Sequence, residues 1–118
     1  MPLLKKPVQL EWTLHAQAKM RQYRLSPARV RHVLHTPKRI EEGIAPKTIA
    51  MMQPASMKTK DTWTQEIWVM IQEAATARKV ISAWRYPGVT KPRSALALGF
   101  LREQYEDFVN DAAERRKE

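Results

Sequence analysis

The sequence contains no cysteine and only three glycines, and no apolar stretch approaches the ~20 residues needed to cross a bilayer. The missing cysteine excludes a disulfide framework and a thiolate zinc site, and it is typical of an intracellular, here cytoplasmic, protein. Residues 1–12 lack the apolar run and the small-residue cleavage site of a signal peptide, so we expect no export by that route. With 43% hydrophobic and 28% charged residues, the chain is expected to be one globular unit without a membrane association.

Acidic residues are scarce in most of the chain. Residues 1–93 hold 17 Lys and Arg against 6 Asp and Glu, a balance of +11, whereas residues 94–118 hold 4 against 6, a balance of −2. A basic body of this kind attracts polyanions through phosphate neutralisation and counterion release. The charge therefore predicts a nucleic-acid partner, and RNA in particular; the alternative is a charge that only keeps the protein soluble.

Two helices are predicted near the N-terminus. Thr13 can cap a helix that runs to about Arg24, with Ala16, Met20 and Tyr23 forming one apolar stripe. Ser26 and Pro27 are typical of a second helix start, and that helix carries Val30, Val33 and Leu34 before Pro37 ends it near Thr36. We expect the two helices to form a short hairpin.

Strand-like alternation surrounds this hairpin. A short edge strand is predicted at residues 7–12, two antiparallel strands around 38–44 and 49–51, a central strand at 63–72 and a closing strand at 78–86. The polar segment 54–62 is expected to be a mobile hairpin connection. Ser94 is a candidate cap for a final helix whose stripe is Leu101, Tyr105, Phe108 and Ala112. The fold class is therefore α+β, with a helical hairpin packed on a four- to five-stranded antiparallel sheet and a C-terminal amphipathic helix.

The first helix concentrates chemistry-bearing side chains. His15 and Lys19 lie one turn apart, with Arg21 and Arg24 on a neighbouring stripe. An imidazole that exchanges a proton near neutral pH, beside cations that hold a phosphate, is the combination that metal-free RNA cleavage needs. The alternative is a half-buried His15 that orders the strand-to-helix junction, with the arginines as a solvated face.

The closing strand places Trp84 and Tyr86 on either side of Arg85, near a basic loop that contains Lys91 and Arg93. Aromatic faces beside cations are suited to stacking an unpaired base, although tryptophans in strands more often belong to the core. His32 and His35 have a spacing at which both could ligate a metal, but no further ligands are spaced to complete a site. No metal and no other cofactor is predicted.

The segment HAQAKMRQYRLSPARVRHVLHTPKRIEEG resembles the opening H-A-x-x-R-M-x-x-R-x-I-S-x-x-x-V-x-x-V-L-x-x-P of small bacterial BrnT and RelE-like toxins, and KVISAWRYPG resembles their closing strand. The resemblance covers about residues 12–87, with Lys19 in place of the first Arg and Leu25 in place of the usual Ile. The second Arg of the pattern falls at Tyr23, directly before Arg24. It implies a RelE-like fold, metal-independent RNA cleavage and a small antitoxin partner. His15 and Arg24 are carried over as candidate catalytic residues.

Together these features predict a RelE/BrnT-like basic domain at residues 1–93 and a helical extension at 94–118. The predicted function is that of a toxin-type, metal-independent endoribonuclease, acting on RNA that is free or bound to the ribosome. Its catalytic residues would be His15, as acid and base, with Arg24 and Arg85; its RNA-binding residues would be Lys19, Arg21, Trp84, Tyr86, Lys91 and Arg93. Two alternatives stay open: a non-catalytic RNA-binding module and a toxin directed at a protein such as gyrase.

Overall fold

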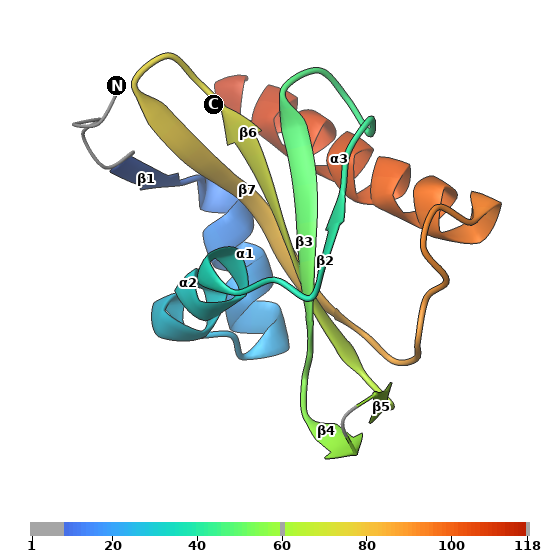
Figure 1. Cartoon of the computed structure of the whole chain (residues 1–118). Coiled ribbons are helices and arrows are strands. Elements are labelled where there is room, and N and C mark those ends of the chain that lie inside the picture. The colour runs from blue at the N-terminus through green and yellow to red at the C-terminus, as the bar shows by residue number, and fades with distance from the viewer. Residues whose placement is uncertain (1–8, 60, 118) are drawn as a thin grey trace, which may run out of the picture.

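A computed structural model describes residues 9–59 and 61–117 as an α+β fold with helices on both faces of a sheet (Figure 1). Within this part of the chain, no helix is long and apolar enough to cross a membrane. Residues 7 and 8 of the predicted first strand lie outside the described residues. In chain order the elements are β1 (Gln9–Trp12), α1 (Leu14–Tyr23), α2 (Pro27–His35), β2 (Arg39–Glu41), β3 (Thr48–Pro54), β4 (Met57–Thr59), β5 (Thr62–Trp63), β6 (Glu66–Glu73), β7 (Ala77–Tyr86) and α3 (Ala95–Arg116).

The main sheet has five strands in the order β1-β7-β6-β3-β2. Four of them form an antiparallel array, as expected, but β1 pairs with β7 in parallel, so the prediction of a purely antiparallel sheet was wrong. The reason is the route of the chain: α1 and α2 carry it from β1 at one edge to β2 at the other. Such a crossover leaves β1 free to enter beside β7 in the same direction, because no tight hairpin joins the two strands.

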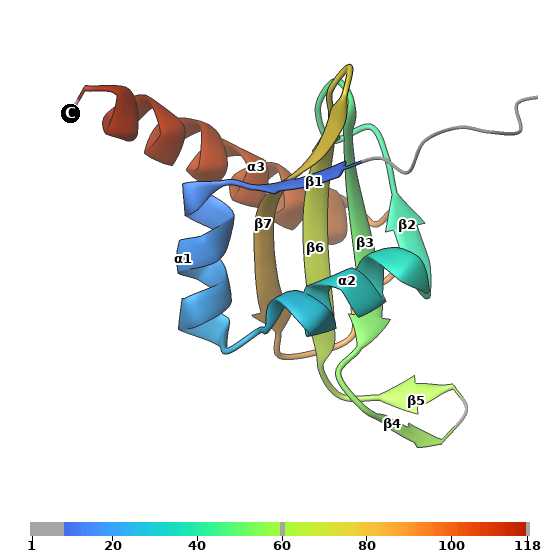
Figure 2. The ribbon, with the colours of Figure 1, turned by 90° about the vertical axis from the view of Figure 1, so that its left-hand side faces the viewer.

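α1 and α2 cover one face of the sheet, where α1 packs mainly on β7 and α2 on β6 and β3 (Figure 2). The two helices run in clearly different directions, so the expected helical hairpin is not confirmed. Both predicted caps are confirmed: the Thr13 side chain accepts from the Ala16 amide, and the Ser26 side chain accepts from the Arg29 amide. These bonds satisfy helix-end donors that would otherwise lack a partner. The predicted stripes face the sheet, and their buried members are Ala16, Met20, Val30 and Val33.

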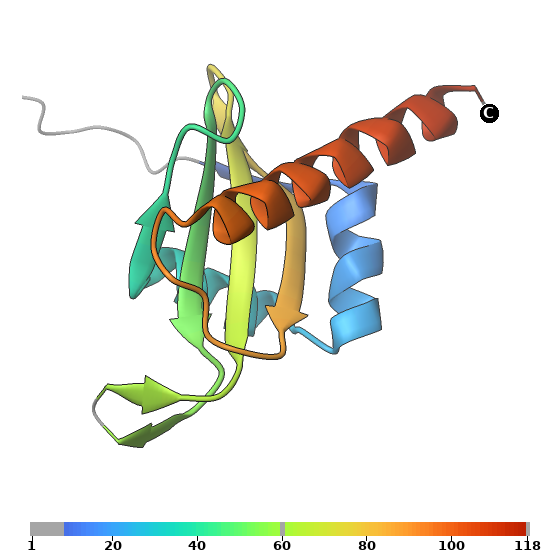
Figure 3. The ribbon, with the colours of Figure 1, turned by 90° about the vertical axis from the view of Figure 1, so that its right-hand side faces the viewer.

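α3 covers the opposite face (Figure 3). Ser94 caps it by accepting from the Ala97 amide, and Leu101 is completely buried against the sheet. Tyr105 and Phe108 of the predicted stripe pack around the same cluster. The C-terminal part of α3 continues past the edge of the sheet and reaches α1.

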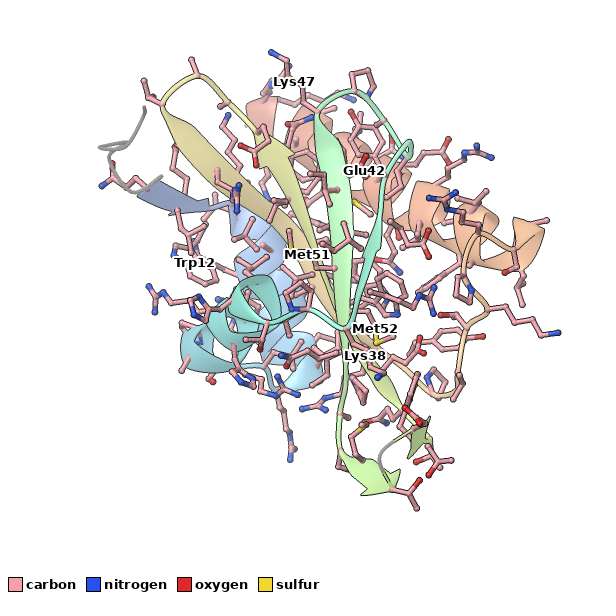
Figure 4. The ribbon with its side chains drawn as sticks, viewed as in Figure 1. Trp12, Lys38, Glu42, Lys47, Met51 and Met52 are labelled. Atoms are coloured by element: carbon pink, nitrogen blue, oxygen red, sulfur yellow. The ribbon has the colours of Figure 1, made fainter. Side chains whose placement is uncertain are left out.

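Successive side chains of the central strands pack into two separate hydrophobic cores, one on each face of the sheet. Met51 belongs to the hydrophobic cluster under α1 and α2, and Met52 belongs to the cluster under α3. Figure 4 labels both residues on β3. This alternation is the period-two geometry of a strand covered on both faces. Segment 54–62, expected to be a mobile hairpin connection, joins β3 to β6 and forms most of the short hairpin β4–β5, which projects from the lower end of the sheet in Figure 1.

Candidate nucleic-acid interface

Arg85 occupies the end of β7, where it meets the C-terminus of α1. Its Nε donates to the carbonyl of Tyr23 over 2.8 Å, and its Nη2 lies 3.5 Å from the carbonyl of Arg24. Its Nη1 lies 3.4 Å from Oε1 of Gln65. A cation at the carbonyl end of a helix is favourably placed against the helix dipole, so these contacts fix the guanidinium in position.

Arg29, in the first turn of α2, is a second guanidinium held at this end of the sheet. It donates to the side chain of Gln53 and, over 3.3 Å, to the carbonyl of Pro54. Burial lowers the pKa of the Arg29 guanidinium, and the neighbouring charge of Arg85 lowers it further. Two like charges are therefore held at the same end of the sheet, where each disfavours the other, and a bound anion would relieve this repulsion.

Arg24 and Lys38 add two exposed cations to this end. Arg24 follows α1 directly, and its carbonyl bonds to Arg85. Lys38 lies beside Met52 at the lower end of β3, and its amide donates to the Met52 carbonyl (Figure 4). We call the surface formed by Arg24, Arg29, Lys38 and Arg85 the basic end.

The basic end is electrostatically unbalanced. Among residues 9–59 and 61–117, none of its four cations makes an ion pair with a carboxylate. The partners of its two fixed guanidiniums are instead carbonyls, neutral amides and the imidazole of His32. Fixed, uncompensated guanidiniums are well suited to bind phosphate oxygens, because the Arg fork matches them in a bidentate manner.

His15 lies elsewhere, at the first turn of α1 beneath α3. Its Nδ1 lies 2.7 Å from Oδ2 of Asp111, and its ring meets the edge of Phe108 at 6.0 Å between centroids. The Nε2 atom is buried without a hydrogen-bond partner among the described residues. The hydrogen bond to His15 lowers the pKa of the Asp111 carboxyl, with smaller contributions from Arg115. His15 therefore joins α1 to α3 and is covered in this structure.

The structure does not bring His15 together with the arginines predicted to share its site. Arg24 comes nine positions after His15, which at 1.5 Å per residue is about 13 Å along the axis of α1. One scissile phosphate bound at Arg24 would lie well away from His15. The predicted constellation is thus split, with Arg24 and Arg85 at the basic end and His15 at the opposite end of α1.

The prediction that Trp84 stacks an RNA base was wrong. Its side chain is 1% exposed, and it packs parallel to Trp68 with the edge of Phe100 against it. Tyr86 is half-buried and packs on Phe100 at 5.0 Å between ring centroids. Both residues belong to the core beneath α3, because that helix covers the face of β7 on which they lie.

The other predicted RNA contacts are dispersed. Arg21 lines a shallow depression of about 460 Å³ together with Arg24 and Ser26, next to the basic end. Lys19 is half-buried, with its Nζ 5.2 Å from the centre of the Tyr23 ring. Lys91 and Arg93 are exposed in the loop between β7 and α3, where Arg93 shares a depression with the carboxylate residues Glu41 and Glu42.

His32 and His35 are exposed on α2. Across the described ranges, no three His, Asp or Glu residues cluster so that they could hold a metal ion. The Nδ1 of His32 lies 3.4 Å from Nη1 of Arg29, which places this imidazole at the border of the basic end. His32 is therefore the α2 histidine for which a contact with the basic end is seen.

Several important residues were missed at the sequence level. Arg29 carried a usable signal, because a cation in the first turn of a helix opposes the helix dipole and so calls for a reason. Asp111 also carried one, since it lies three residues after Phe108, beside the apolar stripe of α3. The contacts of Lys38, Gln53 and Gln65 depend on tertiary structure and had no local signal.

No protein-family model matches the chain, and no curated protein or solved structure matches it significantly. The similarity to BrnT and RelE-like toxins therefore stays a prediction from the sequence.

Proposed function

We propose that this chain is an RNA-binding domain that holds the phosphate backbone at its basic end. The observation that carries the proposal is the pair Arg29 and Arg85, two guanidiniums that neutral acceptors fix at the same end of the sheet, without a carboxylate partner among the described residues. Holding like charges together costs free energy unless a ligand compensates it, so the pair is better explained by function than by stability.

Binding assays with charge-matched variants test this proposal. The double variant Arg24→Gln/Arg29→Gln removes two cations at the basic end, and Arg102→Gln/Arg116→Gln removes two exposed cations from α3. Fluorescence anisotropy with a labelled 20-nucleotide RNA should show an affinity loss of about tenfold or more for the first variant, since each charged hydrogen bond contributes roughly 1.5–3 kcal/mol. The α3 variant should change affinity less than threefold. Equal losses of affinity in both variants would mean that binding depends only on the net charge of the protein, and they would refute a specific RNA-binding site at the basic end.

We propose as a second candidate that the bound RNA is cut without a metal, by a RelE/BrnT-like toxin that acts in the cytoplasm and is held inactive by an antitoxin. The RelE-like arrangement of hairpin and sheet is part of this proposal. The observation that favours it is the exposed His32 imidazole 3.4 Å from Arg29, which pairs a proton-transfer group with phosphate ligands. His15, the histidine proposed from the sequence, would act only if α3 moved away from it.

Three single variants distinguish these sites: His32→Gln, His15→Gln and, as a matched exposed control on α2, His35→Gln. Cleavage of naked RNA and of ribosome-bound message is measured in the presence of chelator. If the chemistry is at the basic end, His32→Gln should lower the rate by roughly 10²–10⁴ and His35→Gln should not. If His15→Gln is the only variant that loses cleavage, the catalytic site lies at His15, beneath α3, and not at the basic end. If the wild type cuts neither substrate, the nuclease proposal fails and RNA binding alone is retained.

A further inference from the structure

We infer that Trp63 is a stacking platform for an unpaired RNA base and that the basic end therefore selects single-stranded RNA. This inference rests on the proposed RNA-binding function and adds the class of RNA. It concerns a residue that the sequence placed at the start of a central strand. In the structure Trp63 lies instead in β5, outside the main sheet, and is half-buried against the edge of the core beneath α3.

The Trp63 ring is held in place from one side. Its Nε1 donates to Oε2 of Glu66 over 3.0 Å, and Glu66 is completely buried. The same carboxylate accepts from Nε1 of Trp68 over 3.1 Å and from the hydroxyl of Thr90 over 2.8 Å. A carboxylate with this many fixed donors cannot move freely, so the indole plane is set before a ligand arrives. A preorganised ring loses little conformational entropy on stacking.

A cation of the basic end lies over the ring. The Nζ of Lys38 is 5.4 Å from the centre of Trp63, within the range of a cation–π contact. An ammonium on a flexible stem can move to a neighbouring phosphate and leave the aromatic face to a base. Stacking on Trp63 would thus place the backbone of the same nucleotide at Lys38, from which the basic end continues toward Arg29.

This geometry favours a single strand over a duplex. Bases inside a double helix stack on one another, so their faces are not available to a protein side chain. Proteins that bind single strands combine a basic track with aromatic side chains on which bases stack, and Trp63 beside Lys38 is that combination. The hairpin β4–β5, which carries Trp63, also projects from the end of the sheet, where a flexible strand can reach it (Figure 1).

The other tryptophans are less suitable and serve as internal references. Trp68 and Trp84 are buried in the core, with 0% and 1% of their surface exposed. Trp12 is half-buried on β1, and the Arg31 guanidinium lies 5.2 Å from its ring centre, away from the basic end. Fluorescence changes on RNA binding should therefore come from Trp63.

The experiment titrates the full chain with a 12-nucleotide oligouridylate and, separately, with an RNA duplex of the same length. Tryptophan fluorescence and anisotropy are recorded for the wild type, Trp63→Leu, Trp63→Phe and the control Trp12→Phe. We expect the single strand to quench the wild type and to bind more tightly than the duplex. Trp63→Leu should abolish most of the quenching and lower single-strand affinity by about 5- to 100-fold, with little effect on the duplex.

Trp63→Phe keeps an aromatic face and should retain most of the single-strand affinity, which separates stacking from a general loss of fold. Trp12→Phe should keep both the affinity and the quenching. If the wild type binds both RNAs equally, without quenching, the inference is overturned and the proposed RNA binding stands. If it binds neither RNA, the proposed function itself is refuted, and the inference with it.

Discussion

Arg24 has a left-handed backbone conformation, with φ at 55° and ψ at 50°, at the end of α1. This region costs a residue with a Cβ roughly 1–2 kcal/mol, and helices that end in this way most often have glycine at the position. The end of the helix explains why the backbone is left-handed here, but it does not explain why the residue is an arginine. A cation at a place where glycine would be more stable is consistent with selection for binding.

Arg24→Gly should therefore stabilise the fold and weaken RNA binding at once. Relief of the strain, partly offset by the greater freedom of glycine in the unfolded chain, should raise stability by about 0.5–1 kcal/mol and the melting temperature by about 2–5 °C. Circular dichroism melting and RNA anisotropy measure the two effects. Arg24→Ala is the control, because it removes the charge and keeps the strain: it should bind weakly without the gain in stability. A destabilised Arg24→Gly would contradict this account of the helix end.

At the residue scale, the sequence predicted backbone features better than surface exposure. Thr13, Ser26 and Ser94 cap their helices as expected, because capping depends on neighbours in the chain. For Trp84 and His15 the structure agrees with the alternatives, a core tryptophan and a half-buried histidine. The sequence could not decide between the two interpretations, because α3 covers both residues and its position depends on contacts far away in the sequence. Arg85 lies at the end of the closing strand, as expected, although nothing local indicated its bonds to the carbonyls of Tyr23 and Arg24.

At the scale of elements, α3 is attached mainly through its apolar face. Leu101 is completely buried on the sheet, whereas Val109 is 41% exposed on the same helix. Leu101→Ala should cost about 2–4 kcal/mol of unfolding free energy, from lost burial plus the cavity left behind. Val109→Ala should stay within about 0.5 kcal/mol of the wild type, as surface substitutions usually do. Denaturant unfolding followed by circular dichroism measures both, and equal effects would mean that α3 is not packed as described.

The contact between His15 and Asp111 should make the junction of α1 and α3 sensitive to acid. The pKa of Asp111 is lowered chiefly by its hydrogen bond to His15, so its contribution to stability is present above the unfolded value of about 4. That contribution is lost as the pH falls through the lowered pKa. It should be about 1 kcal/mol, because the pair is only partly shielded from solvent.

Asp111→Asn should therefore lose less stability than the wild type between pH 5 and pH 2, as measured by chemical unfolding at each pH. Asp107→Asn, at an exposed position on the same helix, is the control and should follow the wild type. If Asp111→Asn and the wild type have the same pH profile, the contact does not stabilise the folded state.

The elements themselves were largely predictable. The Ser26-Pro27 start and the Pro37 stop bound α2 correctly, since these residues act on the local backbone. Local sequence signals could not predict that β1 pairs with β7 in parallel or that the core is divided into two. Both depend on which face each helix covers, and amphipathic stripes show that a helix is covered without showing by what.

For the molecule as a whole, the uneven charge acquires a spatial meaning. Segment 1–93, with its excess of positive charge, contains the basic end. Segment 94–118, with its small excess of negative charge, contains α3, which lies on the face of the sheet opposite α1 and α2 (Figures 2 and 3). The acidic helix therefore does not cover the surface proposed for RNA. With the helices on the two faces of the sheet, the cations of the basic end stay uncovered at the end of the sheet where β3 and β7 finish.

The salt dependence of RNA binding tests the central claim most directly. If a single strand contacts the four cations of the basic end, the slope of log K against log salt concentration should be about −3, a loss of roughly 50-fold between 50 and 200 mM salt. The variant Arg24→Gln/Arg29→Gln should flatten the slope by about 1.4, and Arg102→Gln/Arg116→Gln should leave it unchanged. A wild-type affinity that does not fall with salt, or a slope that both variants flatten equally, would contradict RNA binding at the basic end.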